Sequence, residues 1–115
     1  MPRKLISIIG SSSFLSSNLT SLLRQKDVVV HGYSRRDNNP NIDVFHHFDY
    51  PNSLPNLRTL CKSDVIIYAA GNGIQANQKV ADLEILNLNT YYPINLMTSL
   101  NSLDYKGQFL SLIHI

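Results

Sequence analysis

The sequence predicts an α/β fold with an open parallel sheet, and three observations favour it. Short apolar segments rich in β-branched residues recur along the chain, and segments with helical spacing of leucines lie between them. The apolar segments are only about five residues long, which is typical of strands buried on both faces of a parallel sheet. Strands that alternate with helices at this spacing indicate right-handed crossovers between parallel neighbours.

The first half of the chain contains three predicted strands and one helix. Residues 5–9 form an apolar strand, and residues 14–23 carry Phe and Leu at helical spacing after a serine that suits an N-cap. Residues 28–33 form a second β-branched strand. Residues 35–41 are a polar, proline-containing loop, and residues 44–48 predict a short third strand.

The second half repeats the alternation. Leucines in residues 54–62 predict a short helix or 3₁₀ segment, and residues 64–70 form a buried strand that ends in small residues. Residues 71–78 are polar and contain glycine, which indicates a loop. Residues 80–103 have a helical apolar stripe that Pro93 interrupts, which predicts a kink or two helices. Residues 109–113 predict the last strand.

The composition excludes several classes of protein. The chain has 115 residues, enough for one domain, and a net charge of +2 opposes a nucleic-acid partner. The single cysteine, Cys61, excludes an intrachain disulfide or a cysteine-type zinc site, and no two of the four histidines have the i, i+4 spacing of a helical metal pair. No segment has the length of a membrane span or of a signal peptide, so we expect a cytoplasmic protein without a membrane partner.

The turn after the first strand is a candidate phosphate site. Ligands of parallel α/β sheets bind at the carboxyl ends of the strands. Gly10 allows a tight turn there, and the N-terminus of the following helix offers backbone N–H groups to an anion. Ser12 and Ser13 would add hydroxyl donors. The alternative is a plain N-cap with solvated serines.

Two arginines, Arg35 and Arg36, follow the second strand. In dinucleotide-binding sheets an acid at the end of this strand accepts from the ribose 2′-OH, whereas an arginine accommodates a 2′-phosphate. Ser34 is no acid, and the planar guanidinium suits phosphate. The sequence therefore favours NADP over NAD, which stays possible, and two solvated arginines on a loop are the alternative.

Two more candidate positions follow the third and fourth strands. Asp49 would accept a hydrogen bond from an adenine amino group. The alternative is an Asx turn before Pro51. Ala69, Ala70 and Gly71 would let a flat cofactor lie against the backbone, and ordinary tight packing is the alternative.

Five segments in one order resemble a known pattern. It consists of a Gly-x-x-Gly-Phe-Ile-Gly turn, an Asp-hydrophobic pair, an Asp-Val-Val-hydrophobic-His-x-Ala strand, an Asn-x-x-x-Pro/Thr-x-Asn-Leu helix and a fifth strand. The similar segments here are Ile9–Ser16, Asp49–Tyr50, Asp64–Ala70, Asn89–Leu96 and Gln108–Ile113. Over nearly its whole length, the chain thus resembles the N-terminal half of the extended short-chain dehydrogenase/reductase family, the NAD-dependent epimerase/dehydratase group.

The resemblance implies a Rossmann-type sheet of about five strands, in the order 3-2-1-4-5, flanked by helices over residues 1–115 and truncated before the catalytic half. It implies a pyrophosphate at the first turn, adenine at Asp49 and, by similarity to NADP-using members of the GDP-mannose dehydratase type, a 2′-phosphate at the arginines. The expected cofactor-binding residues are Gly10, Ser12, Ser13, Phe14, Leu15, Arg35, Arg36, Asp49, Tyr50, Ala69, Ala70, Gly71 and Asn89.

The sequence departs from the family pattern at three places. Ser13 and Ser16 replace glycines of the first turn, and Tyr68 stands where histidine is common. The family's Tyr-x-x-x-Lys acid/base pair follows its fifth strand, and no tyrosine here has a lysine four residues later. The sequence therefore predicts no catalytic residue in these 115 residues, and no metal ligand.

The resemblance implies the NADP(H)-binding half of a nucleotide-sugar epimerase, dehydratase or reductase, whose longer parent chain would bind the nucleotide sugar. The alternative is a non-catalytic NAD(P)-binding or protein-interaction module. The intact mass of the natural gene product separates these expectations. An exposed last strand, or the long helix, predicts a homo-oligomer. The apolar residues of that strand are Leu110, Leu112, Ile113 and Ile115.

Overall fold

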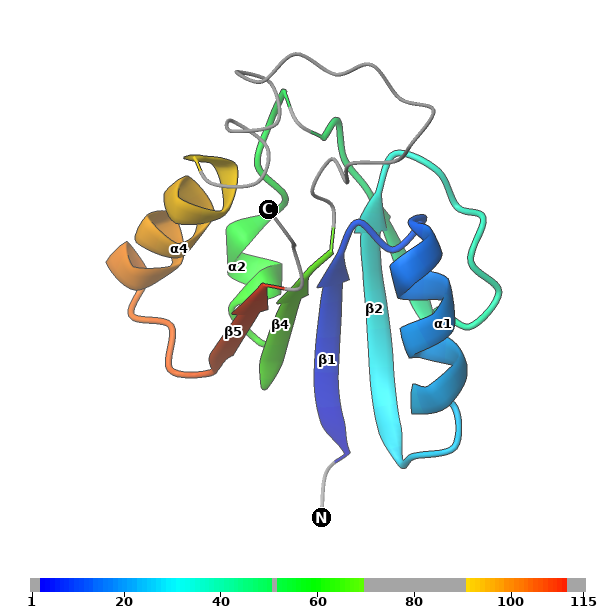
Figure 1. The fold of residues 1–115 in the computed structure, drawn as a ribbon. Helices are drawn as coiled ribbons and strands as arrows, with labels where there is room; N and C mark the ends of the chain where they lie inside the picture. The colour runs from blue at the N-terminus through cyan, green and yellow to red at the C-terminus, as the bar shows by residue number, and fades with distance from the viewer. Residues whose placement is uncertain (1–2, 51, 70–90, 112–115) are drawn as a thin grey trace.

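The computed structural model describes residues 3–50, 52–69 and 91–111. Strands and helices alternate along the chain as the apolar pattern predicts, except that a loop and not a helix joins the second and third strands (Figure 1). In chain order the elements are β1 (Lys4–Ile9), α1 (Phe14–Leu23), β2 (Val28–Ser34), β3 (Val44–His47), α2 (Leu57–Leu60), β4 (Val65–Tyr68), α4 (Tyr92–Ser102) and β5 (Gln108–Ser111).

The strands form one parallel sheet in the order β3-β2-β1-β4-β5. This confirms the predicted fold class and the strand order 3-2-1-4-5. The central strand β1 is buried on both faces over its second half, where Ser7, Ile8 and Ile9 are all inaccessible. Because every strand runs in the same direction, all carboxyl ends lie at one edge of the sheet (Figure 1).

Two aspartates hold the beginnings of neighbouring strands together. The Asp64 carboxylate, just before β4, accepts a hydrogen bond from the Leu5 N–H at 2.8 Å. The Asp43 carboxylate, just before β3, accepts from the Val30 N–H at 2.8 Å. Each bond satisfies a backbone donor of the adjacent strand. Both bonds therefore help to set the register of the strands, and with it the relative positions of the carboxyl ends.

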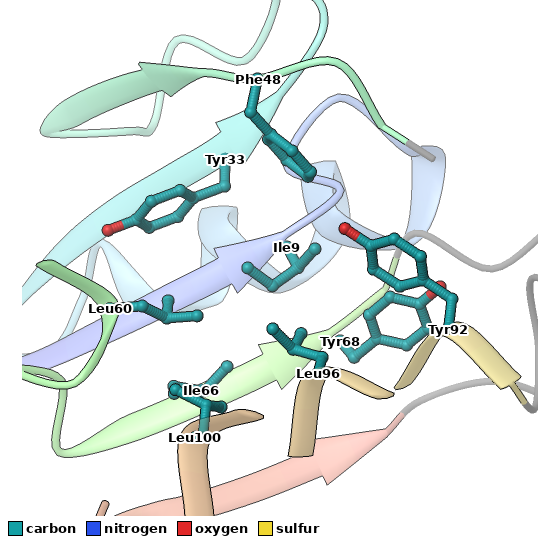
Figure 2. Packing of buried hydrophobic residues seen from close by; sticks show 9 residues of the cluster. All are labelled: Ile9, Tyr33, Phe48, Leu60, Ile66, Tyr68, Tyr92, Leu96 and Leu100. Atoms are coloured by element: carbon teal, nitrogen blue, oxygen red, sulfur yellow. The ribbon is translucent and has the colours of Figure 1, made fainter. Parts of the chain in front are cut away.

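Helices cover both faces of the sheet. Leu19 and Leu23 of α1 pack on a cluster that includes Ile8 and Val30. Helices α2 and α4 cover the other face, over a larger and more aromatic cluster (Figures 1 and 2). This second cluster consists of Ile9, Tyr33, Phe48, Leu60, Ile66, Tyr68, Tyr92, Leu96 and Leu100.

The observed boundaries refine two predicted helices. The helix expected at 54–62 covers only Leu57–Leu60, because the Asn56 side chain accepts from the Thr59 N–H and begins it there. Pro93 lies in the first turn of α4, where its missing N–H costs nothing. The predicted loop at 71–78, the predicted helical residues 80–90 and the end of the last strand lie outside the described residues. Among the described helices, none has the length and apolar character needed to cross a membrane.

Candidate functional site

The turn between β1 and α1 lies at the carboxyl edge of the sheet and is held against β2. Gly10 has φ = 89°, a left-handed conformation that favours glycine. Its N–H donates to the Tyr33 carbonyl at 2.7 Å, and the Ser11 N–H donates to the same carbonyl at 3.4 Å. The chain is therefore turned sharply at the end of β1 and enters α1 directly beside the end of β2.

The two serines that replace family glycines bond to each other. Ser13 is the N-cap of α1, and its Oγ accepts from the Ser16 N–H at 3.1 Å. The Ser13 hydroxyl donates to Ser16 Oγ at 2.9 Å, and the Ser16 hydroxyl donates to the Gly10 carbonyl at 2.7 Å. Both hydroxyls thus stabilise the turn itself.

The first turn of α1 supplies backbone donors. The first N–H groups of a helix have no intrahelical acceptor. The Ser13 side chain satisfies the N–H of Ser16, and the Ser17 N–H makes the first bond back to the Ser13 carbonyl at 3.0 Å. The N–H groups of Phe14 and Leu15 precede these and are the donors that a helix N-terminus offers to an anion.

A cleft of about 570 Å³ opens beside this turn, between the ends of β2 and β3. Its lining includes side chains of opposite charge, and Arg35 Nε lies 3.8 Å from Asp49 Oδ1. Both side chains are more than half exposed, so their attraction is weak. The lining residues of this outer cleft are Ser12, Arg35, Arg36, Asn38, His47 and Asp49.

A smaller inner cleft of about 130 Å³ adjoins the outer one, and Ser12 and Arg35 line both. The inner cleft brings the glycine turn, the end of β2 and an aromatic side chain together. Its lining residues are Gly10, Ser12, Ser13, Ser34, Arg35 and Tyr50. The two clefts thus meet at Ser12 and Arg35, between the N-terminus of α1 and the end of β2.

Three tyrosines form a cluster behind the inner cleft. Tyr50 Oη lies 2.7 Å from Tyr68 Oη, and the Tyr68 ring stacks on that of Tyr92 (Figure 2). The Tyr92 hydroxyl donates to the Ser53 carbonyl at 2.8 Å. Burial is the main cause that raises the pKa of all three phenols, and the nearby Tyr50 hydroxyl raises the pKa of Tyr68 and Tyr92 further. The phenols therefore stay neutral at physiological pH and act as hydrogen-bonding groups, not as bases.

The structure brings together most of the residues expected to bind a cofactor. Those that line the clefts are Gly10, Ser12, Ser13, Arg35, Arg36, Asp49 and Tyr50. Leu15 is exposed on α1, and Ala69 is buried in the cluster under α1, where its N–H donates to the Ile9 carbonyl at 2.9 Å. Ala70, Gly71 and Asn89 lie outside the described residues. Asp49 also begins a turn, since its carbonyl accepts from the Ser53 N–H at 3.0 Å.

Three cleft residues were not among the sequence-based candidates: Ser34, Asn38 and His47. A signal existed for Ser34 and His47, because each is the last residue of its strand and strand ends converge at this edge. Asn38 had no such signal, since it lies in the middle of a polar loop whose path no local pattern predicts.

A larger cleft of about 740 Å³ lies at the opposite edge, between the beginnings of β1, β4 and β5. Lys4, Lys62 and Lys106 line it, and the Tyr105 hydroxyl forms part of its wall by donating to the Ser63 carbonyl at 2.9 Å. No helix N-terminus of the described residues faces this edge, whereas the N-terminus of α1 lies at the carboxyl edge. We therefore assign the candidate site to the carboxyl edge. Among the described residues no three His, Cys, Asp or Glu side chains gather as a metal site would need.

Comparison with known proteins identifies a family. A family model described as the NAD dependent epimerase/dehydratase family matches residues 6–113. No curated protein matches the chain.

Several solved structures share the fold. A UDP-glucose 4-epimerase superposes with a TM-score of 0.66 and 14% identity, over 92% of this chain and 35% of that one. The PbgP3 protein from Burkholderia pseudomallei gives 0.70 and 17%, over 96% and 35%. An NADH-dependent reductase complexed with NAD gives 0.62 and 18%, over 95% and 58%. The chain therefore spans between about one third and three fifths of the length of these proteins.

Proposed function

Because the chain belongs to the NAD-dependent epimerase/dehydratase family, we propose that it is the NADP(H)-binding half of a nucleotide-sugar epimerase, dehydratase or reductase. One observation carries the choice of NADP: Arg35 and Arg36 line the outer cleft next to the glycine turn. The cleft volume of about 570 Å³ lies within the range of about 300–1,000 Å³ that is usual for small-molecule sites.

The turn fits a pyrophosphate group. Gly10, with its positive φ, lets the chain pass tightly from β1 into α1. The first N–H groups of α1 would donate to the phosphate oxygens, and Ser12 would add a hydroxyl. The hydroxyls of Ser13 and Ser16 are already engaged within the turn, so their contribution is to hold these donors in place.

The end of β2 fits a 2′-phosphate. Ser34 carries no charge there, and the guanidinium groups of Arg35 and Arg36 supply planar donor forks for phosphate oxygens. Asp49 would accept from the adenine amino group. Since Arg35 pairs with Asp49 at 3.8 Å, a bound 2′-phosphate would compete with this carboxylate for the same guanidinium.

The cofactor, when bound, would accept or supply a hydride. The residues that line the two clefts would bind and orient it. The Tyr-x-x-x-Lys pair is absent from the 115 residues, so the acid/base step and the nucleotide-sugar site belong to a longer parent chain in this proposal.

A second candidate function is a non-catalytic NAD(P)-binding or protein-interaction module. The same absence of a Tyr-x-x-x-Lys pair favours it. The intact mass of the natural gene product distinguishes the two. A chain two to three times longer that contains the pair is expected for the enzyme, whereas a product of this length supports the module.

Arg35→Ala tests the cofactor assignment. We expect NADPH affinity to fall about 10- to 100-fold, the effect of losing hydrogen bonds to a charged group. NADH affinity should change by less than about twofold, because NADH lacks the 2′-phosphate. Titration calorimetry with each cofactor measures both values.

Arg58→Ala is the matched control, because Arg58 is exposed on α2 and lines neither cleft. It should leave both affinities unchanged. Equal losses for NADPH and NADH in Arg35→Ala would contradict the 2′-phosphate assignment. Absence of binding in the unaltered chain would contradict the proposed function.

A further inference from the structure

Ser34 lies at the junction of the three segments that form the candidate site. It is the last residue of β2, is 3% exposed, and directly precedes Arg35. Its carbonyl accepts from the Phe48 N–H at 3.2 Å, which holds the exit of β3 beside it. Ser34 therefore contacts both the segment that carries the arginines and the segment that leads to Asp49.

The Ser34 hydroxyl connects the glycine turn to the arginine segment. The Ser11 hydroxyl donates to Ser34 Oγ at 3.3 Å, and the Ser34 hydroxyl donates to the Arg36 carbonyl at 2.7 Å. Ser11 is itself buried, and a side chain at Gly32 would lie only 2.6 Å from its Oγ. The Ser11 side chain thus packs closely over Gly32, two residues before Ser34.

The loop that carries Arg35 and Arg36 also contacts Ser11 at its far end. Asn39 is buried, and its Nδ2 donates to the Ser11 carbonyl at 3.0 Å. The loop is thus anchored near both ends to Ser11, through the Ser34 hydroxyl at one end and through Asn39 at the other. Arg35 and Arg36 are exposed near this end of the loop, and the described residues hold them through the Arg36 carbonyl and the weak pair of Arg35 with Asp49.

We propose that Ser34 is a positioning residue for cofactor selectivity: its hydroxyl holds the Arg35–Arg36 segment at a fixed place beside the glycine turn. An anionic ligand that spans the glycine turn and the Arg35–Arg36 segment can contact both only if the distance between the turn and the guanidinium groups is kept. This inference rests on the proposed function, because it concerns how the site distinguishes NADP(H) from NAD(H).

Ser34→Ala removes the link, and the ratio of NADPH to NADH affinity in the 115-residue chain is the measurement. We expect NADPH affinity to fall about fivefold, the effect of one hydrogen bond. NADH affinity should stay within about twofold, because the glycine turn is intact. Ser34→Cys fills the same space with a weaker donor and should lower the ratio in the same direction, even if the alanine variant folds poorly.

Ser7→Ala is the matched control. Ser7 is buried as Ser34 is and forms a hydroxyl pair with Ser63, at 2.5 Å, but it lines neither cleft. It should lower the melting temperature without changing the affinity ratio. An unchanged ratio in both Ser34 variants, or equal losses for the two cofactors, would overturn the inference while leaving the proposed function intact. If the unaltered chain binds neither cofactor, the proposed function fails and the inference fails with it.

Discussion

Ser13 and Ser16 show how two residues can replace glycine in a tight turn and still preserve it. Glycine at these positions allows close approach of a ligand and of the helix. Here the Ser16 side chain is fully buried, and its hydroxyl donates to the Gly10 carbonyl while accepting from Ser13. The turn therefore depends on side-chain hydrogen bonds, where the family pattern depends on the absence of side chains.

Ser16→Ala should reduce the free energy of unfolding by about 1–2 kcal/mol, because it removes buried hydrogen bonds. Urea unfolding followed by circular dichroism measures this. Ser17→Ala is the control, since Ser17 is exposed on the same helix, and it should change stability by less than about 0.5 kcal/mol. Equal effects of the two variants would show that the Ser16 hydroxyl does not stabilise the turn.

Strands β2 and β3 are joined by a pair of histidines as well as by backbone bonds. His46 Nε2 lies 3.0 Å from His31 Nδ1, so one ring must donate and the other accept. The Tyr33 ring stacks on His46 at 4.4 Å. Burial lowers the pKa of both imidazoles. The neighbouring His46 lowers that of His31 further, and Asp43 opposes this shift.

Stability should therefore fall on acidification. Above the ordinary histidine pKa of 6.5 both rings are neutral whether the chain is folded or unfolded. Below it the unfolded chain binds protons that the folded chain excludes, so the free energy of unfolding decreases with falling pH. Urea unfolding between pH 7.5 and pH 5 measures the slope.

His46→Gln should flatten this slope, because it removes one of the two shifted groups. His47→Gln is the control, since the neighbouring His47 side chain is exposed at the outer cleft. It should retain the slope of the unaltered chain. A slope that is the same in His46→Gln and in the unaltered chain would exclude the histidine pair as its origin.

Strand β5 is an edge of the described sheet and carries Leu110, which is 45% exposed. Exposed apolar edges pair with other chains unless charge opposes it. Leu112, Ile113 and Ile115, which the sequence adds to this edge, lie outside the described residues. Helix α4 also exposes Ile94 and Met97, and these apolar side chains would form the interface if the long helix were the surface that associates.

We expect the chain to self-associate with rising concentration, and Leu110→Lys to weaken this association by about tenfold or more, since it puts a charge on the edge strand. Sedimentation velocity over a concentration series measures it. Leu22→Lys is the control, because Leu22 is 64% exposed on α1, far along the chain from β5. A monomeric unaltered chain would exclude the edge as an interface. Equal weakening by both variants would point to non-specific association.

At the scale of the molecule, the parallel sheet places three turns side by side. The turn after β1 supplies Gly10 and Ser12, the end of β2 supplies Ser34 and the arginines, and the end of β3 leads to Asp49. Each of these segments, taken alone, has an ordinary local interpretation. Only their convergence on two adjoining clefts makes them a candidate site, and that convergence follows from the strand order β3-β2-β1-β4-β5.

The sequence by itself determined the strands, the tight turn at Gly10 and the cap at Ser13. These depend on apolar periodicity, backbone freedom and hydrogen bonds between residues a few positions apart. Only the tertiary structure decided that Ser11 bonds to Ser34, 23 residues later, and that Tyr50 meets Tyr68, 18 residues later. Parallel strands need long crossovers, so their paired ends come from distant parts of the chain, and no local pattern encodes which side chains meet there.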